Sequence, residues 1–94
     1  MRSSTALKNE IRKWLEKRRD GEAKIVSIAE WKRRGEEWGS NSAFIMTIEG
    51  SPLYTLLNYG DDEWQAANEL RAICQRHGFW YQHDYHWSLS FHEI

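Results

Sequence analysis

Apolar side chains recur at helical spacing near the start of the chain. The stripe consists of Leu7, Ile11, Trp14 and Leu15. These positions fall at i, i+4, i+7 and i+8, which places them on one side of a helix. Ser3 or Ser4 can cap its start by accepting a hydrogen bond from an unpaired backbone N–H. Gly21 suits the left-handed residue that ends many helices. We therefore predict a helix over residues 4–20.

A second apolar stripe lies in the last third of the chain. Its members are Trp64, Ala67, Leu70, Ile73 and Cys74. Asp61 or Asp62 can cap this helix, and Asp62 with Gln65 three residues later matches a capping box. Gly78 follows the last apolar position and suits the helix end. The pattern predicts a helix over residues 62–77.

The segment between these helices favours strands. Residues 23–31 are rich in β-branched side chains and predict a strand. The following stretch, Trp31–Ala43, is polar and contains glycine, so we expect a long loop. Long loops inside small domains are often functional. This one carries aromatic and cationic side chains, namely Trp31, Lys32, Arg33, Arg34 and Trp38.

Residues 43–49 and 53–58 predict a hairpin around Gly50-Ser51, because glycine supplies the positive φ that a type II′ turn requires. In that register one face of the hairpin is apolar and is expected to join the core. It carries Phe44, Met46, Ile48, Leu53 and Leu57. The opposite face includes Ile45 and Leu56, which is unusually apolar for a solvent-facing surface. We expect a second layer or a partner to cover it.

A second hairpin is predicted over residues 79–82 and 85–92, with its turn at His83-Asp84. The apolar positions of its second strand are Tyr85, Trp87, Leu89 and Phe91. They alternate with a row of histidines and serines, which predicts one buried and one open face. The turn leaves the register undecided. Either Phe79 and Tyr81 or Trp80 should flank the histidine and serine row.

Together these elements predict one α+β domain over residues 1–94, in the order α-β-β-β-α-β-β. Two helices should pack on one face of a mostly antiparallel sheet of about five strands. The first five elements resemble the order of the double-stranded-RNA-binding domain. In that family lysines at the start of the last helix contact phosphate. Here the helix starts with Asp61, Asp62 and Glu63, which would repel phosphate, so no residue role is carried over.

Composition indicates the cellular compartment in which the protein is expected. The single cysteine, Cys74, cannot form an intramolecular disulfide, which is typical of a reducing compartment. The N-terminal residues lack the apolar core of a signal peptide, and no apolar run is long enough to span a bilayer. We therefore expect a cytoplasmic protein without a membrane partner. No glycine-rich phosphate loop or paired-carboxylate signature is present, so we expect neither a cofactor nor catalysis.

Two compositional features favour a macromolecular partner. The chain has 6 tryptophans among 94 residues, and an exposed tryptophan is a candidate contact residue. Residues 1–34 carry 11 Lys/Arg and 5 Asp/Glu, whereas residues 35–94 carry 2 and 9. The two halves either neutralise each other in the fold or leave a basic surface for a partner. The candidate binding residues are Arg12, Lys13, Trp31, Lys32, Arg33, Arg34, Trp38, His86 and His92.

We expect a non-catalytic binding or regulatory domain with a protein partner, acting as a monomer or a homodimer. The first alternative is nucleic-acid binding by the basic N-terminal helix and Trp31–Arg34, because aromatic side chains interleaved with cations suit single strands. The second is a small ribonuclease that uses His86 and His92 as acid and base. These two histidines stand roughly 20 Å apart along a strand, which is too far to share one phosphate.

Four side chains near the C-terminus could ligate zinc in principle. They are Cys74, His77, His83 and His86. Their spacing matches no familiar structural zinc pattern. Cys74 lies on an apolar stripe, where a free cysteine usually acts as a small buried apolar residue. His77 at a helix C-terminus is explained by the helix dipole. The sequence therefore predicts no metal site.

Overall fold

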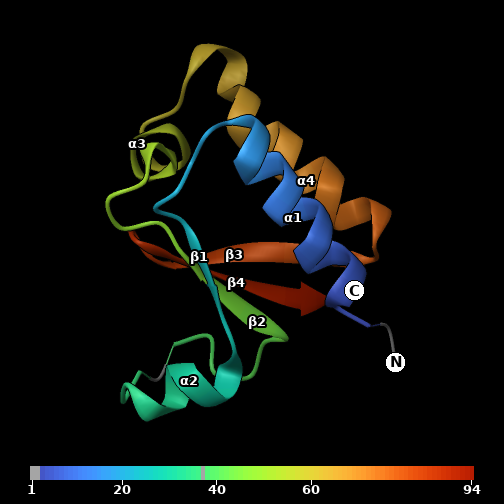
Figure 1. The fold of residues 1–94 in the computed structure, drawn as a ribbon, viewed down its shortest axis with the longest axis vertical. Helices are drawn as coiled ribbons and strands as arrows, with labels where there is room; N and C mark the ends of the chain where they lie inside the picture. Colours follow the sequence, from blue (N-terminus) through green and yellow to red (C-terminus); the bar gives the residue numbers. More distant parts are fainter. Residues whose placement is uncertain (1–2, 37) are drawn as a thin grey trace.

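A four-stranded antiparallel sheet in the order β1-β2-β4-β3 forms the centre of the fold, with helices on both of its faces (Figure 1). The computed structural model describes residues 3–36 and 38–94. Its elements are α1 (Thr5–Lys17), β1 (Lys24–Val26), α2 (Ile28–Arg33), β2 (Phe44–Thr47), α3 (Pro52–Asn58), the 3-10 turn η1 (Asp62–Trp64), α4 (Gln65–Arg76), β3 (Phe79–Tyr85) and β4 (Ser88–Glu93). The predicted α+β class and antiparallel pairing are confirmed, while the strand number and element order differ.

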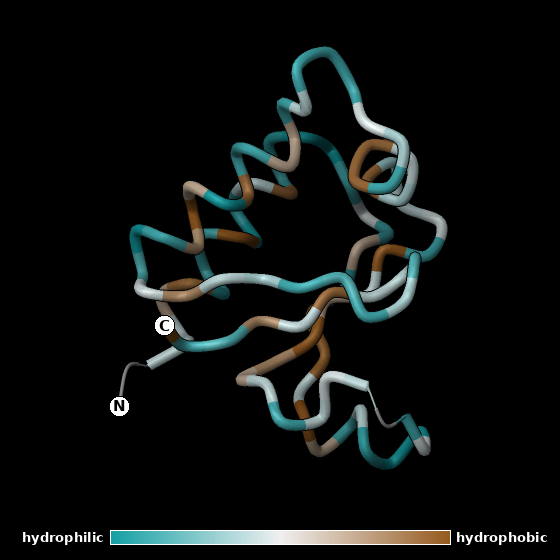
Figure 2. The backbone as a smooth tube through the Cα atoms, turned by 180° about the vertical axis from the view of Figure 1, so that it is seen from behind, coloured by the Kyte–Doolittle hydropathy of each residue, from teal (hydrophilic) through white to brown (hydrophobic). Residues whose placement is uncertain are grey.

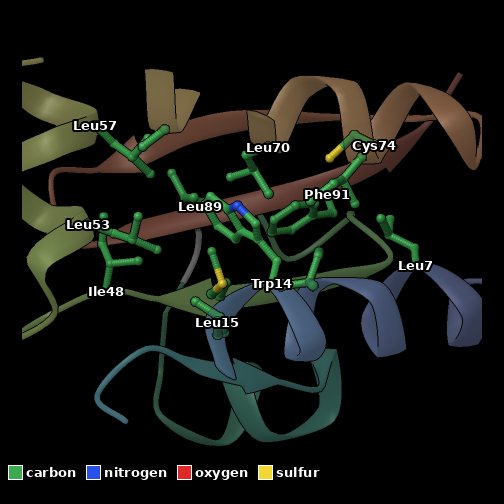
Figure 3. Close-up of a cluster of buried hydrophobic side chains, with 14 of the residues drawn as sticks. Leu7, Trp14, Leu15, Ile48, Leu53, Leu57, Leu70, Cys74, Leu89 and Phe91 are labelled. Carbon is green, nitrogen blue, oxygen red and sulfur yellow. The ribbon is translucent and has the colours of Figure 1, made fainter. Parts of the chain in front are cut away.

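The main core lies between the sheet and the layer of α1, α3 and α4. Figure 3 shows Trp14, Leu70, Leu89 and Phe91 pointing toward one another from both long helices and the sheet. Phe91 also stacks on Phe44 of β2, with ring centroids 4.5 Å apart. All four stripe residues predicted for the first helix are buried in this core. The loop between α3 and α4, by contrast, forms a hydrophilic tip (Figure 2).

The predicted strand 23–31 is wrong beyond Val26, because a helix begins there instead. The side chain of Ser27 accepts a hydrogen bond from the backbone N–H of Glu30, 3.2 Å away. This is the N-terminal signature of a helix, a serine followed three residues later by glutamate. Part of the predicted loop is therefore α2. It lies on the face of the sheet opposite α1 (Figure 1) and buries Trp31 against Val26 and Ile45.

The predicted hairpin at Gly50-Ser51 is also wrong, since α3 replaces its second strand. Ser51 caps this helix by accepting from the N–H of Leu53 at 3.0 Å, and Pro52 takes the first helical position. Proline is favoured there because its fixed φ is helical and its missing N–H needs no partner. The five side chains predicted for the apolar face are nonetheless all buried in the main core. The second layer that covers Ile45 is α2.

The last two strands meet at a later turn than predicted, so that β3 is longer and β4 (Ser88–Glu93) shorter than expected. β3 runs through His83 to Tyr85, with a bulge between them, and the turn follows at residues 86–87. The expected open face is only partly present, because Ser88 and Ser90 are completely buried, whereas His86 is exposed and His92 is half-buried. Trp87 is half-buried rather than central, and stacks on Tyr85 with centroids 5.1 Å apart.

The helix ends also differ from expectation. Arg19 (φ 57°), and not Gly21, is the left-handed residue after α1. The regular part of the second predicted helix starts only at Gln65, and Asp61 accepts a 3.1 Å hydrogen bond from the N–H of Ala66. Trp64 has a left-handed backbone and is 47% exposed, so it does not belong to the apolar stripe. The helices between the strands rule out the element order of the double-stranded-RNA-binding domain.

Candidate functional site

A hollow with two exposed indoles opens on the face of the sheet that α2 covers. Its lining consists of Trp38, Gly39, Ser40, Asn41, Trp80, Gln82, Asp84 and His92. Trp38 is 63% and Trp80 44% exposed, although large apolar rings are normally buried. They come from segments far apart in the sequence, the loop after α2 and strand β3, and meet around one surface depression.

The loop that carries Trp38 is anchored by a hydrogen bond from a buried side chain. Trp31 is completely buried, and its indole Nε1 donates a 2.8 Å hydrogen bond to the carbonyl oxygen of Trp38. The next residue, Gly39, has φ 83° and lies directly against the sheet. A Cβ there would collide with Asp84 Oδ2 and press on Ile45, so only glycine permits this approach.

Strands β3 and β4 supply the other wall. Trp80 pairs with His92 in the register, and their rings stack with centroids 4.6 Å apart. This confirms that an aromatic residue flanks the histidine and serine row, and identifies it as Trp80. His92 Nε2 also lies 3.0 Å from the hydroxyl oxygen of the buried Ser90, and this hydrogen bond orients the imidazole ring.

Asp84 gives the hollow its electrostatic character. Its Oδ1 accepts a 2.8 Å hydrogen bond from Gln82 Nε2, while its Oδ2 is buried without a hydrogen-bond partner among the described residues. The described lining contains this one carboxylate and neither lysine nor arginine. The hollow therefore favours neutral or cationic groups over phosphate.

The structure separates the two groups of predicted basic binding residues. Arg12 and Lys13 are exposed on α1, whereas Lys32, Arg33 and Arg34 are exposed on or next to α2, on the other side of the sheet (Figure 1). They do not form one continuous surface. Of the predicted aromatic contacts, Trp38 is exposed but Trp31 is completely buried, so Trp31 supports the loop rather than touching a partner.

Two of the three cations in or beside α2, Arg33 and Arg34, already have local interactions. Arg33 forms an ion pair with Glu30 at 2.7 Å, and the guanidinium of Arg34 lies over the Trp31 ring, 5.9 Å from its centroid. Glu30 also has a lowered pKa, because its carboxylate accepts from Arg33 and is further favoured by the charges of Arg33 and Arg34.

The histidines of the proposed acid and base pair lie apart. His86 is at the turn between β3 and β4, whereas His92 is near the end of β4. A different pair meets instead. His83 and His86 line a second hollow with Tyr54, Asn58 and Trp87. Desolvation lowers the pKa of His83, and the charge on His86 lowers it further.

The potential zinc ligands are likewise divided. Burial raises the pKa of the Cys74 thiol to about 12. His77 Nε2 lies 2.7 Å from Glu10 Oε1 and is engaged by α1. Across residues 3–36 and 38–94, no three histidine, cysteine, aspartate or glutamate side chains come together in a way that could hold a metal ion.

Sequence reasoning missed Trp80, Gln82 and Asp84 as lining residues. The available signal was their alternate spacing, which puts all three on one face once β3 is extended through position 85. Nothing in the sequence showed that Gly39 would approach Asp84, because that contact joins distant segments.

No helix within the described ranges is both long enough and apolar enough to cross a membrane. No protein-family model matches the chain, and neither a curated protein nor a solved structure matches it.

Proposed function

We propose that this chain is a non-catalytic binding domain for a protein partner, which it contacts through the hollow between Trp38 and Trp80. The observation that carries this proposal is the exposure of two indoles at 63% and 44% around a single depression. Tryptophan is enriched among the residues that dominate the energy of protein interfaces, because its large ring gains much from burial. Cys74 is a free, buried thiol, which suits the cytoplasmic setting that we propose.

The polarity of the hollow favours a protein over a nucleic acid. Serine, asparagine and glutamine side chains surround the indoles and offer neutral hydrogen-bonding groups. Asp84 places a carboxylate where a nucleic-acid strand would bring phosphates. A cationic or neutral side chain of a protein meets no such repulsion, and a cation gains further from the indole faces.

Single-stranded nucleic acid is the second candidate ligand. Lys32, Arg33 and Arg34 stand in or beside α2, one short segment from Trp38, and the stacked rings of Trp80 and His92 could receive a base. Such binding would weaken steeply with salt. A ribonuclease that relies on His86 and His92 draws no support from their positions, since His86 lies in the turn before β4 and His92 near the end of that strand.

Affinity capture tests the proposal. The wild-type chain and its Trp38→Ala and Trp80→Ala variants are immobilised and exposed to lysate of the source cells, with and without nuclease treatment, at moderate salt. Tyr59→Ala is the matched control, because Tyr59 is 73% exposed but follows α3, away from the hollow.

We expect one protein to be retained by the wild type and by Tyr59→Ala, and to be lost with either tryptophan variant. Retention that disappears after nuclease treatment would assign the surface to nucleic acid. Equal retention by all variants would refute the role of the hollow.

A further inference from the structure

The two outer strands of the sheet differ in how well they are protected against pairing. β1 has three residues and begins with Lys24. β3 spans seven residues, Phe79–Tyr85, and contains neither lysine nor proline. Its bulge lies only at the His83 end. Short length, lysine, proline and bulges are the features that usually prevent an edge strand from pairing with another chain, and most of β3 lacks them.

The register shows which backbone groups of β3 face outward. The N–H of Ile94 donates to the carbonyl of Gly78 at 2.9 Å, while the N–H of Gly78 donates to Gln75 at the end of α4. Gly78 and Ile94 therefore occupy a hydrogen-bonded position of the register between β3 and β4. Antiparallel strands alternate between bonded and non-bonded pairs, so Trp80 and Gln82 also bond to β4. The peptide groups of the intervening residues Phe79, Tyr81 and His83 therefore point away from the sheet.

The other side of β4 supports the same assignment. The N–H of Ile48 donates to the carbonyl of Trp87 at 2.8 Å. Odd-numbered residues of β4 therefore bond to β2, which leaves Ser90 and His92 to bond with β3. The outer edge of β3 thus presents N–H and C=O groups at three alternate positions.

A groove runs beside this edge, between β3 and α4. Its lining consists of Arg71, Cys74, Gln75, Phe79, Trp80 and Tyr81. Arg71 is its one charged residue. Among the described residues Arg71 donates a 3.0 Å hydrogen bond to Asn68, and no carboxylate forms an ion pair with it. The groove therefore combines an apolar floor with a cation that is available to an acidic group.

We propose that an extended segment of a protein partner adds to the sheet along β3, with an acidic side chain directed to Arg71. Its backbone would bond to the outward groups of Phe79, Tyr81 and His83, and alternate side chains would enter the groove. Peptide addition to an edge strand beside a helix is an established mode of recognition, in which the backbone gives affinity and the pockets give specificity. The inference rests on the proposed function only in taking the partner to be a protein, because the groove and the hollow share Trp80 but no other lining residue.

The position of α4 favours a partner segment over a second copy of this chain. α4 packs on β3. Strands in a sheet lie roughly 4.8 Å apart, whereas helices pack at roughly 8–10 Å. Pairing two β3 strands across a two-fold axis would therefore bring two α4 helices too close, and a single added strand avoids this conflict.

The test uses a phage-displayed library of linear peptides, selected on the immobilised full chain. We expect the selected peptides to alternate apolar and polar residues and to share an acidic position. Amide exchange followed by NMR then locates the bound peptide. At saturation the amides of Phe79, Tyr81 and His83 should become protected.

The amide of Ile25 is the internal control. The backbone groups of Met46 point toward β4, as those of Ile48 do. Ile25 is the partner of Met46 in β1, so this pair is not hydrogen-bonded. The N–H and C=O groups of Ile25 therefore face outward at the other edge of the sheet. Its exchange should not change. Selection of no peptide, or of peptides that leave the three β3 amides unprotected, would overturn the proposal.

Charge variants test the acidic position. Arg71→Glu should weaken the selected peptides roughly tenfold or more, and Arg71→Lys should retain most of the affinity. Lys17→Glu is the matched control, because it makes the same change in net charge at an exposed position of α1. Equal weakening by Arg71→Glu and Lys17→Glu would contradict a specific contact. If Trp38→Ala abolishes partner capture while the β3 amides stay unprotected, the proposed function stands and this inference fails.

Discussion

The indole nitrogen of Trp31 donates a 2.8 Å hydrogen bond to the carbonyl oxygen of Trp38. The first residue belongs to α2 and is completely buried, and the second is 63% exposed at the rim of the candidate site. The bond therefore links the second hydrophobic cluster, formed by Val26, Trp31 and Ile45, to the loop that presents an exposed indole. The packing of α2 and the geometry of the site depend on the same side chain.

Trp31→Phe is expected to weaken both stability and partner binding. Phenylalanine retains an aromatic ring in the cluster but has no donor for the Trp38 carbonyl. We expect the free energy of unfolding to fall by roughly 1–3 kcal/mol, measured by urea denaturation. Partner affinity, measured by calorimetry, should fall as well because the loop is no longer held.

Trp14→Phe provides the control for that variant. It also removes an indole donor, which bonds to Glu69 at 2.8 Å, but on the face of the sheet away from the hollow. It should lower stability without changing partner affinity. If both variants reduced affinity alike, the effect would come from general destabilisation.

The cap of α2 can be tested separately. Ser27→Ala removes the acceptor for the Glu30 N–H and should lower the free energy of unfolding by about 1 kcal/mol, whereas Ser27→Asp should retain most of it. Urea denaturation of the three chains measures the difference. A loss of equal size in Ser27→Asp would show that the capping bond is not responsible.

The sequence predicts the two long helices well because their apolar stripes are continuous. α2 was missed because β-branched residues at positions 25, 26 and 28 favour a strand, while the helix signal is confined to Ser27 and Glu30. α3 was missed for a related reason. Leu53 and Leu57 are four residues apart, a spacing that places them on one face of either a strand or a helix. Their burial could therefore be predicted although their secondary structure could not.

The candidate site was less predictable than the core. Trp38 was identified because it lies in a segment predicted as a long loop, where an exposed tryptophan is a candidate contact residue. Trp80 and Asp84 required the register of β3 and β4, and the bulge and the turn at residues 86–87 carry no strong sequence signal. The basic residues were visible in the sequence, but their separation onto opposite faces depends on α2 crossing to the second layer.

Glu10 should make stability depend on pH. Hydrogen bonds from His77 and then Arg76 lower the pKa of its carboxyl in the folded state. Its contribution to stability is therefore present above the ordinary glutamate pKa of 4.5, and is lost as the pH falls through the lower folded value. Glu10→Gln should thus be less stable than the wild type at neutral pH, by about 1 kcal/mol or less because solvent screens this partly exposed cluster.

Thermal unfolding of both chains between neutral pH and acid measures that effect. The gap between the melting temperatures should close as the pH falls below the folded pKa of Glu10. Glu16→Gln, an exposed position on the same helix, is the control and should show no such convergence. A gap that persists in acid would show that Glu10 acts through packing instead.

Proline substitutions in β3 test the direction of its backbone groups. The N–H of Gln82 is assigned to β4 and that of His83 to the solvent edge, so only Gln82→Pro removes a hydrogen bond of the sheet. Proline occurs in edge strands where the missing N–H would face solvent. Gln82→Pro should therefore be less stable than His83→Pro by roughly 1–3 kcal/mol in urea denaturation. Gln82→Ala and His83→Ala correct for the loss of each side chain. Equal destabilisation by the two prolines, or a larger effect at His83, would contradict this assignment. The outward-facing backbone groups that strand addition requires would then not lie at Phe79, Tyr81 and His83.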